Sequence, residues 1–175
     1  PDGWFNTRGC ALEPRGGMVG PKFFRFTSDK PGRLAKAHLG FGVDGLAYEA
    51  LILGAWVRCQ SIHTGERVGE DPGFVLDFLA DDLRRLARRR LGAHQGPSAN
   101  SSSWKRGARR FPVPPQAKEV LMGLGLHGAT GTFDVDGMTV ELIPRGGRES
   151  LNLVLNGDLE LGDPAPQGWV LERGA

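Results

Sequence analysis

The histidines and carboxylates of this chain do not form a recognisable catalytic pattern. The four histidines lie far apart, at positions 38, 63, 94 and 127. None belongs to a zinc-protease, nucleophile-elbow or phosphate-loop motif. Asp134 and Asp136 lie two residues apart on one strand face, whereas glycosidases hold two carboxyl groups across a cleft. We therefore expect no catalytic residues and no enzyme activity.

Residues 84–90 contain five arginines in seven positions. Guanidinium groups bind oxyanions in a bidentate manner, so this stretch could bind sulfated or uronate glycans, or nucleic acid. Acidic residues precede it between Glu66 and Asp82, which favours a solvated, salt-bridged surface. The whole chain has 22 Lys and Arg against 20 Asp and Glu, a net charge of +2. That balance predicts no nucleic-acid partner.

The composition favours short elements joined by turns. The chain contains 27 Gly and 12 Pro, and its hydrophobic fraction is 39%. Such a mixture is typical of all-β domains. The strongest predicted strand is 48–58, where a period of two places one set of side chains on the core face: Leu51, Leu53, Ala55 and Val57. The opposite face then carries Ile52, Trp56 and Arg58.

Residues 76–90 fit two patterns. Leucines 76, 79, 83 and 86 recur at helical spacing, and the local propensity favours a helix. The surrounding β pattern instead favours a hairpin that turns at Asp81 and Asp82. We predict the hairpin, and the helix is the alternative.

Further strands are expected at 23–26, 104–111, 120–126 and 132–143. Turn residues separate them, as at 27–32, where Pro31 presets φ and Gly32 supplies a positive φ. Residues 95–103 are rich in Ser, Asn and Pro and predict a loop. Pro residues at 112–115 end the strand before them, because proline lacks the backbone donor.

The two cysteines, Cys10 and Cys59, match no metal-binding or redox spacing. One disulfide or two buried thiols both remain open. No apolar run approaches the length that a membrane span needs, so we expect no membrane insertion.

The two ends of the chain resemble each other. Residues 1–10 and 166–175 share five identical positions, among them Trp4 and Trp169, at an offset of 165. Similarity at a fixed offset is typical of tandem modules. We therefore expect residues 1–145 to form one β-sandwich module without its own first strand. Residues 151–175 would begin the next copy, and their first strand could complete the sandwich.

Four local patterns resemble the jelly-roll carbohydrate-binding modules appended to bacterial glycoside hydrolases and polysaccharide lyases. Segment 156–160, Asn-Gly-Asp-Leu-Glu, followed by 166–169, Pro-Gln-Gly-Trp, is similar to the opening of those modules, with Leu in place of Phe. Segment 48–58 is similar to their central strand, and Ser103-Trp104 with 111–114 follows in the expected order. Segment 131–136 resembles their closing strand, where Gly137 replaces a second Asp. The resemblance implies an all-β, two-sheet antiparallel jelly-roll β-sandwich, of the galactose-binding-like kind.

A glycan-binding platform is expected around Trp56. An indole stacks on the C–H face of a pyranose while neighbouring donors and acceptors orient the hydroxyl groups. Trp56 with Arg58 and Gln60 fits this pattern best, and Asp77 is a fourth candidate ligand. The alternative is that the loop before or after this strand covers Trp56 and that Arg58 pairs with a surface carboxylate. Trp4, Trp104 and Trp169 are expected to be structural.

The resemblance also implies a structural calcium ion. Calcium needs several hard oxygen ligands. Asp136 and Glu160 occupy the positions where such modules bring carboxylates of the first and last strands together, and backbone carbonyls would complete the shell.

We thus expect a non-catalytic module that binds a poly- or oligosaccharide and belongs to a larger secreted or surface bacterial protein, linked covalently to neighbouring domains. The alternative is a structural or adhesive spacer that mediates protein contacts in a repetitive surface protein.

Overall fold

The computed structural model describes residues 4–5, 9–92, 101–146, 151–154 and 157–160. All regular elements in these residues are β-strands, and none of the described residues forms a helix that could cross a membrane. The strands are β1 (Trp4–Phe5), β2 (Cys10–Glu13), β3 (Phe23–Ser28), β4 (Lys36–Gly42), β5 (Tyr48–His63), β6 (Gly73–Leu79), β7 (Arg85–Gly92), β8 (Ser101–Pro112), β9 (Glu119–Gly125), β10 (Thr130–Pro144) and β11 (Leu151–Asn152).

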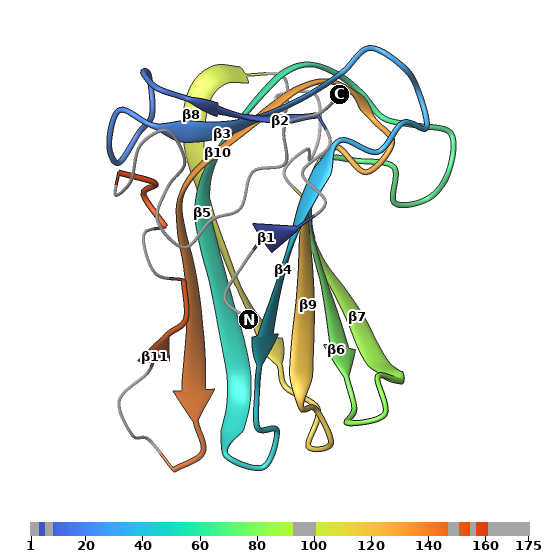
Figure 1. Cartoon of the computed structure of the whole chain (residues 1–175), viewed down its shortest axis with the longest axis vertical. Coiled ribbons are helices and arrows are strands. Elements are labelled where there is room, and N and C mark those ends of the chain that lie inside the picture. The colour runs from blue at the N-terminus through green and yellow to red at the C-terminus, as the bar shows by residue number, and fades with distance from the viewer. Residues whose placement is uncertain (1–3, 6–8, 93–100, 147–150, 155–156, 161–175) are drawn as a thin grey trace.

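The strands form two antiparallel sheets. The five-stranded sheet has the order β1-β4-β9-β6-β7, and the six-stranded sheet has the order β2-β3-β10-β5-β8, with β11 paired to β10. The chain changes sheet at most steps, so neighbours in space are rarely neighbours in sequence. Figure 1 shows β4, β9, β6 and β7 fanned on one side of the molecule, with β5 and β10 on the other. The predicted all-β, two-sheet jelly-roll sandwich is confirmed.

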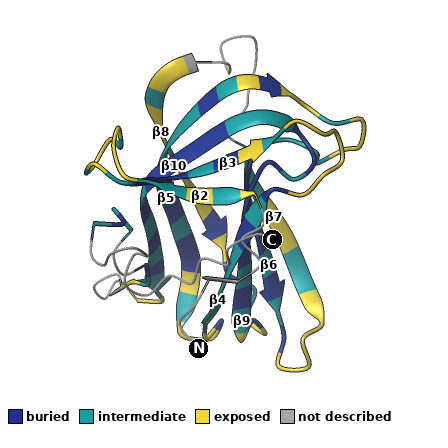
Figure 2. Cartoon of the chain, turned by 45° about the horizontal axis from the view of Figure 1, so that its top comes forward, coloured by how far each residue is buried: buried dark blue, intermediate teal, exposed yellow. Residues whose placement is uncertain are grey.

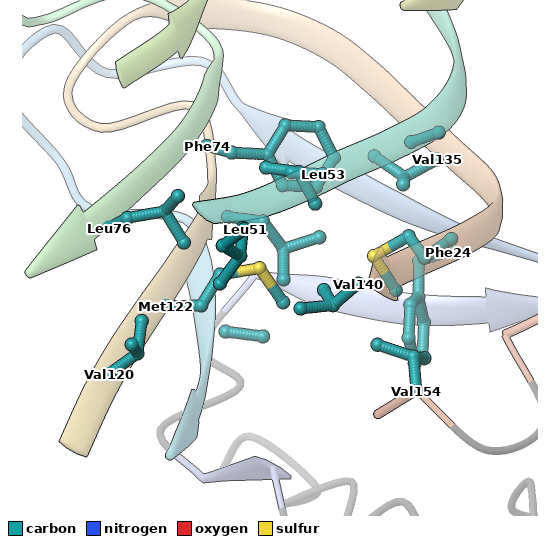
Figure 3. Close-up of a cluster of buried hydrophobic side chains, with 14 of the residues drawn as sticks. Phe24, Leu51, Leu53, Phe74, Leu76, Val120, Met122, Val135, Val140 and Val154 are labelled. Carbon is teal, nitrogen blue, oxygen red and sulfur yellow. The ribbon is translucent and has the colours of Figure 1, made fainter. Parts of the chain in front are cut away.

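The core lies between the sheets and is built by alternate residues of each strand. On β5, Leu51 and Leu53 are fully buried, as the period of two predicts. On β9, Val120 and Met122 face them from the opposite sheet. Figure 3 shows these side chains in contact, together with Phe74, Val140 and other apolar groups. Because the alternate residues are fixed inward, the residues between them must point outward.

The disputed segment 76–90 is a hairpin. Strands β6 and β7 pair in antiparallel register, with Asp77 opposite Arg88. The turn lies between them, and Leu83 adopts a positive φ of 60° there. The helical alternative is wrong because β6 lies between β7 and β9, where Phe74 and Phe78 are buried with the period of a strand. Tertiary packing overrides the local propensity.

The described part of 151–160 packs on this same sandwich. Strand β11 pairs with β10, with Asn152 opposite Glu141. Val154 and Leu159 are buried in the core. These contacts agree with a late strand that completes the sandwich. The tandem repeat depends on residues 1–3 and 161–175, which lie outside the described residues, so it stays a prediction.

Cys10 and Cys59 are separate thiols. The strand registers place them in one row, in the order Cys10, Phe26, Phe133 and Cys59. Neighbouring strands lie ~4.8 Å apart, so the two cysteines are separated by roughly 14 Å. A disulfide needs Cα atoms within ~7 Å. The fold therefore excludes a bond between them.

We expect Cys59 to resist thiol reagents in the folded protein. Burial raises its pKa to about 11, and only the thiolate reacts. In a Cys10→Ser variant, native labelling should be very slow, and denaturation should restore one full equivalent. Added reductant should leave the melting temperature unchanged. Absence of any reactive thiol in the denatured wild-type chain would contradict the free-thiol assignment.

Candidate functional site

Two rows of residues cross the outer face of the five-stranded sheet. Because Val120 and Met122 point into the core, the residues next to them on β9 face outward. The registers of β4, β9, β6 and β7 then define the rows. The first is His38, Gly123, Val75 and Arg90, and the second is Gly40, Leu121, Asp77 and Arg88.

A groove of about 300 Å³ follows these rows. The ring of His38 packs closely on Gly123 at its floor, since an added Cβ at this glycine would lie 3.3 Å from Cδ2 of His38. Val75 and Leu121 contribute apolar surface to it, and residues 67–70 of the loop after β5 line its rim. The groove thus combines apolar patches with polar side chains from four strands.

Ion pairs fix the arginines of the groove. Arg88 binds Asp77 through two contacts, Nε to Oδ1 at 2.7 Å and Nη2 to Oδ2 at 2.6 Å. Arg90 binds Asp71, with Nη2 2.9 Å from Oδ1. The bidentate geometry holds the Arg88 guanidinium plane in one orientation. It also engages both oxygens of Asp77.

His127 lies half-buried in the lining of the groove. Its Nε2 is 3.1 Å from the carbonyl oxygen of Gly73. Burial, followed by the nearby positive charges of Arg90 and Lys36, lowers its pKa to about 4. At neutral pH the imidazole is therefore uncharged. It lies beside Gly123, and His38 is close enough to contribute to the lowering of its pKa.

The sequence-predicted ligands fall on two different faces. Trp56, Arg58 and Gln60 alternate along β5 and share the outer face of the six-stranded sheet. Asp77 lies on β6, on the outer face of the opposite sheet. The two faces are separated by the thickness of the sandwich, so Asp77 does not join the other three in one platform.

Arg58 belongs to a cluster around the buried Asp134 on the outer face of the six-stranded sheet. Asp134 is fully buried and accepts contacts from both Arg25 and Arg58, with Nη2 of Arg58 2.7 Å from Oδ2. The Arg58 guanidinium also lies 4.5 Å from the ring centre of Trp104, which in turn packs edge-on against Phe23. Cation–π contacts and the ion pair fix this arginine within the fold. Arg58 therefore pairs with a carboxylate, as the alternative interpretation expected, but this carboxylate is buried and does not lie at the surface. The contacts of Trp104 with Arg58 and Phe23 agree with the expected structural role.

Asp136 and Glu160 lie near each other, as expected. Burial raises the pKa of Asp136, and the neighbouring Glu160 carboxylate adds to this effect. Both side chains are held by the loop between β2 and β3. The backbone N–H groups of Met18 and Val19 donate to Oδ2 of Asp136, at 2.6 and 2.8 Å. The N–H of Lys22 donates to Oε1 of Glu160 at 2.8 Å.

This donor set does not fit a calcium ion. Calcium requires oxygen atoms aimed at the cation, whereas three N–H groups point at the Asp136 carboxylate, including that of Gly137. The ammonium of Lys22 also lies 3.3 Å from the carbonyl oxygen of Glu160. In the part of the chain that is described, no group of three His, Cys, Asp or Glu residues could hold a metal. The calcium site stays a prediction that these contacts do not support.

Backbone geometry explains why glycine replaces the second Asp of the family pattern. Gly137 has a φ of +54°, at a break in the β5–β10 register. An added Cβ would lie 2.4 Å from Cγ2 of Val19 and 3.1 Å from Cδ1 of Trp56. An aspartate at this position would therefore strain the backbone and displace the loop that holds Asp136.

Sequence reasoning missed the groove residues His38, Leu121 and Gly123. A signal was present in 119–125, where Leu121, Gly123 and Gly125 alternate with the core residues of β9. The row partners come from β4 and β6, which are distant in sequence. Only the strand order shows that they meet.

No family model and no curated protein matches this sequence. Among solved structures, the chain is similar to the CBM22-1 xylan-binding domain from Paenibacillus barcinonensis Xyn10C, with 12% identity, a TM-score of 0.48 and coverage of 81% of this chain and 86% of that chain. A CBM4 structure has 14% identity, a TM-score of 0.48 and the same two coverages. The enzymatically active domain of bacteriophage CBA120 tailspike protein 4 has 14% identity and a TM-score of 0.47, and the match covers 79% of this chain but only 20% of the tailspike chain. Likenesses at this level assign no function to the chain.

We expect His127 to make the stability depend on pH. The unfolded chain takes up a proton on this residue near pH 6.5, but the folded protein does so only near pH 4. The free energy of unfolding should therefore fall as the pH is lowered through this window. A shift of this size corresponds to about 3 kcal/mol. Asn tolerates the positive φ of 51° at this position.

Urea unfolding of the wild type and of His127→Asn at pH 4, 5, 6 and 7 measures the effect. The free energy of unfolding of the wild type should fall more than that of His127→Asn as the pH is lowered from 7 to 4. His63→Asn, at an exposed position, is the matched control and should leave the pH profile unchanged. A His127→Asn profile parallel to that of the wild type would contradict the buried neutral imidazole.

We expect chelation to leave the melting temperature unchanged, because N–H donors already satisfy Asp136. Asp136→Asn should destabilise the protein by about 2 kcal/mol, with or without chelator, because it weakens hydrogen bonds to a charged acceptor. Calorimetry of both proteins in EDTA and in excess calcium tests this. A melting temperature of the wild type that falls in EDTA, while that of Asp136→Asn does not respond, would restore the calcium site.

Proposed function

We propose that this chain is a non-catalytic carbohydrate-binding module that holds a poly- or oligosaccharide across the outer face of its five-stranded sheet. One observation carries the proposal: a groove of about 300 Å³ runs over four neighbouring strands, with hydrogen-bonding side chains held in place by ion pairs. Sugar chains present hydroxyl groups around weakly apolar ring faces, and such a groove offers partners for both.

A glycine lets two imidazole rings lie flat on the groove floor. An added Cβ at Gly123 would lie 3.3 Å from Cδ2 of His38 and 3.7 Å from Cε1 of His127, so these rings cover the backbone of β9 and offer their nitrogen atoms to a ligand. Val75 and Leu121 provide the apolar contact beside them. Asp77 and Arg88 are fixed before any ligand arrives, which reduces the entropy lost on binding.

The buried positions of the other carboxylates support a role without catalysis. Asp134 and Asp136 are fully buried and held by arginines and by backbone N–H groups. Asp77 has both oxygens bound to Arg88. A glycosidase instead needs one free acid and one free base or nucleophile facing the substrate.

We place the module in a larger secreted or surface protein, where it would tether a neighbouring domain to its polysaccharide. Tethering raises the effective concentration of the substrate without new contacts at the active site. The face around Trp56 is the competing site for the same glycan. The engagement of Arg58 by Asp134 and Trp104 argues against it.

A glycan-array screen of the purified chain, followed by calorimetry on the best hit, tests the function. We expect the double variant Asp77→Asn, Arg88→Gln to weaken binding at least about tenfold, because hydrogen bonds to charged groups contribute about 1.5–3 kcal/mol each. Removing both charges together avoids leaving either partner of the bidentate pair alone, and in the described part of the chain the only other ion pair lost is the longer one from the exposed Arg85 to Asp77, at 3.8 Å. Gln60→Ala, on the other sheet, is the matched control and should bind normally.

Two results would overturn this assignment. Loss of affinity in Gln60→Ala and Trp56→Phe, with normal binding by the groove variant, would move the site to the six-stranded sheet. A blank array would favour the spacer that mediates protein contacts.

A further inference from the structure

The edge strands of the two sheets lie beside each other and are both rich in cations. Strand β7 ends the five-stranded sheet and β8 ends the six-stranded sheet. They meet where Nη1 of Arg109 lies 3.5 Å from the carbonyl oxygen of Arg90. Figure 2 shows exposed residues on both strands. This flank, which we call the basic flank, carries nine cationic side chains: Arg84, Arg85, Arg88, Arg89, Arg90, Lys105, Arg106, Arg109 and Arg110.

Three of these cations occupy core-side positions. Arg89 is opposite Leu76 in the β6–β7 register, and Leu76 is fully buried. Arg109 and Lys105 are likewise opposite the core-side residues Leu53 and Val57 of β5. The period of two would place apolar residues at all three positions. Cations from both edges therefore line the mouth of the sandwich between β7 and β8.

Four carboxylates pair with part of the basic flank. They are Glu49, Asp71, Asp77 and Asp82. Arg89 and Arg109 instead donate to backbone carbonyl oxygens, those of Arg88 and Arg90. Across the described ranges, no carboxylate forms an ion pair with Arg89, Arg106 or Arg109. Nothing lies within 4 Å of an added Cβ at Gly107, so there is open space between Lys105 and Arg109 on the same strand face. Arg106 lies opposite Trp56 and points to the outer face of the six-stranded sheet.

We propose that the basic flank is a second binding site, for the sulfate or carboxylate groups of an anionic polysaccharide. Exposed guanidinium groups without a carboxylate partner bind such oxyanions in a bidentate manner. Strand β7 forms both the wall of the groove, through Arg88 and Arg90, and the edge of the flank. The choice of a polysaccharide as the ligand rests on the proposed function, because a glycan that extends beyond the groove would pass over β7.

The same residues argue against nucleic acid. Single strands bind by stacking bases on aromatic rings. The described aromatic rings of β8 are unsuited to this, since Phe111 is buried and Trp104 is packed against Arg58 and Phe23. The net charge of +2 also gives little long-range attraction for a dense polyphosphate.

The test compares the full chain with the triple variant Arg89→Gln, Arg106→Gln, Arg109→Gln. The probes are dextran sulfate, polygalacturonate, neutral dextran and single-stranded DNA, with binding measured by calorimetry at low and at physiological salt. We expect the triple variant to lose at least about tenfold in affinity for one or both anionic polysaccharides. Which of the two is affected identifies sulfate or carboxylate as the ligand group.

The matched control is Arg15→Gln, Lys30→Gln, Arg33→Gln. It removes the same charge at exposed positions on other loops and should bind like the wild type. The groove variant Asp77→Asn, Arg88→Gln should lose the array hit while the triple variant retains any neutral glycan. The two proposals can therefore fail separately.

Three outcomes would overturn the proposal. One is equal loss of affinity in the control variant, which would indicate charge alone. Another is unchanged affinity with self-association of the triple variant, detected by light scattering, which would show that the cations only protect the sheet edges. The last is binding of DNA as tight as that of both polysaccharides.

Discussion

The alternation of side chains along paired strands is the constraint on which the rest of the structure depends. Leu51 and Leu53 of β5 pack against Val120 and Met122 of β9, and this contact fixes which residues of each strand face outward. A shift of one residue would exchange the two sets. The positions of the groove rows and of the Asp134 cluster therefore follow from core packing, because the inward-facing residues of each strand determine which residues face outward.

The two outer faces use their charged residues differently. On the six-stranded sheet, Asp134 is buried beneath two arginines, so that its charge is compensated within the fold. On the five-stranded sheet, Arg88 and Asp77 form a comparable pair at the surface, where both line the groove. Removal of one partner of the buried pair would leave an uncompensated charge. The surface pair can exchange contacts with a ligand at much lower cost.

The sequence predicted the sandwich well because apolar and polar residues alternate clearly along its strands. The hairpin of β6 and β7 and the two faces of β5 follow from the period of two. The site was predicted poorly because the order of strands is not visible in the chain. Asp77 was grouped with Trp56, although β6 and β5 lie in different sheets. The family pattern brought Asp136 and Glu160 together correctly, but it could not show that N–H groups of the loop at Met18 and Val19 would surround Asp136.

The cations at core-side positions of β7 and β8 have two physical consequences. An edge strand offers unpaired backbone groups, and inward-pointing charges prevent another chain from adding to the sheet. Arg89 and Arg109 occupy core-side positions, together with Lys105, and the arginines bind backbone carbonyls in place of carboxylates. Guanidinium groups without acidic partners thus gather along the edge between β7 and β8, an arrangement that suits an extended polyanion.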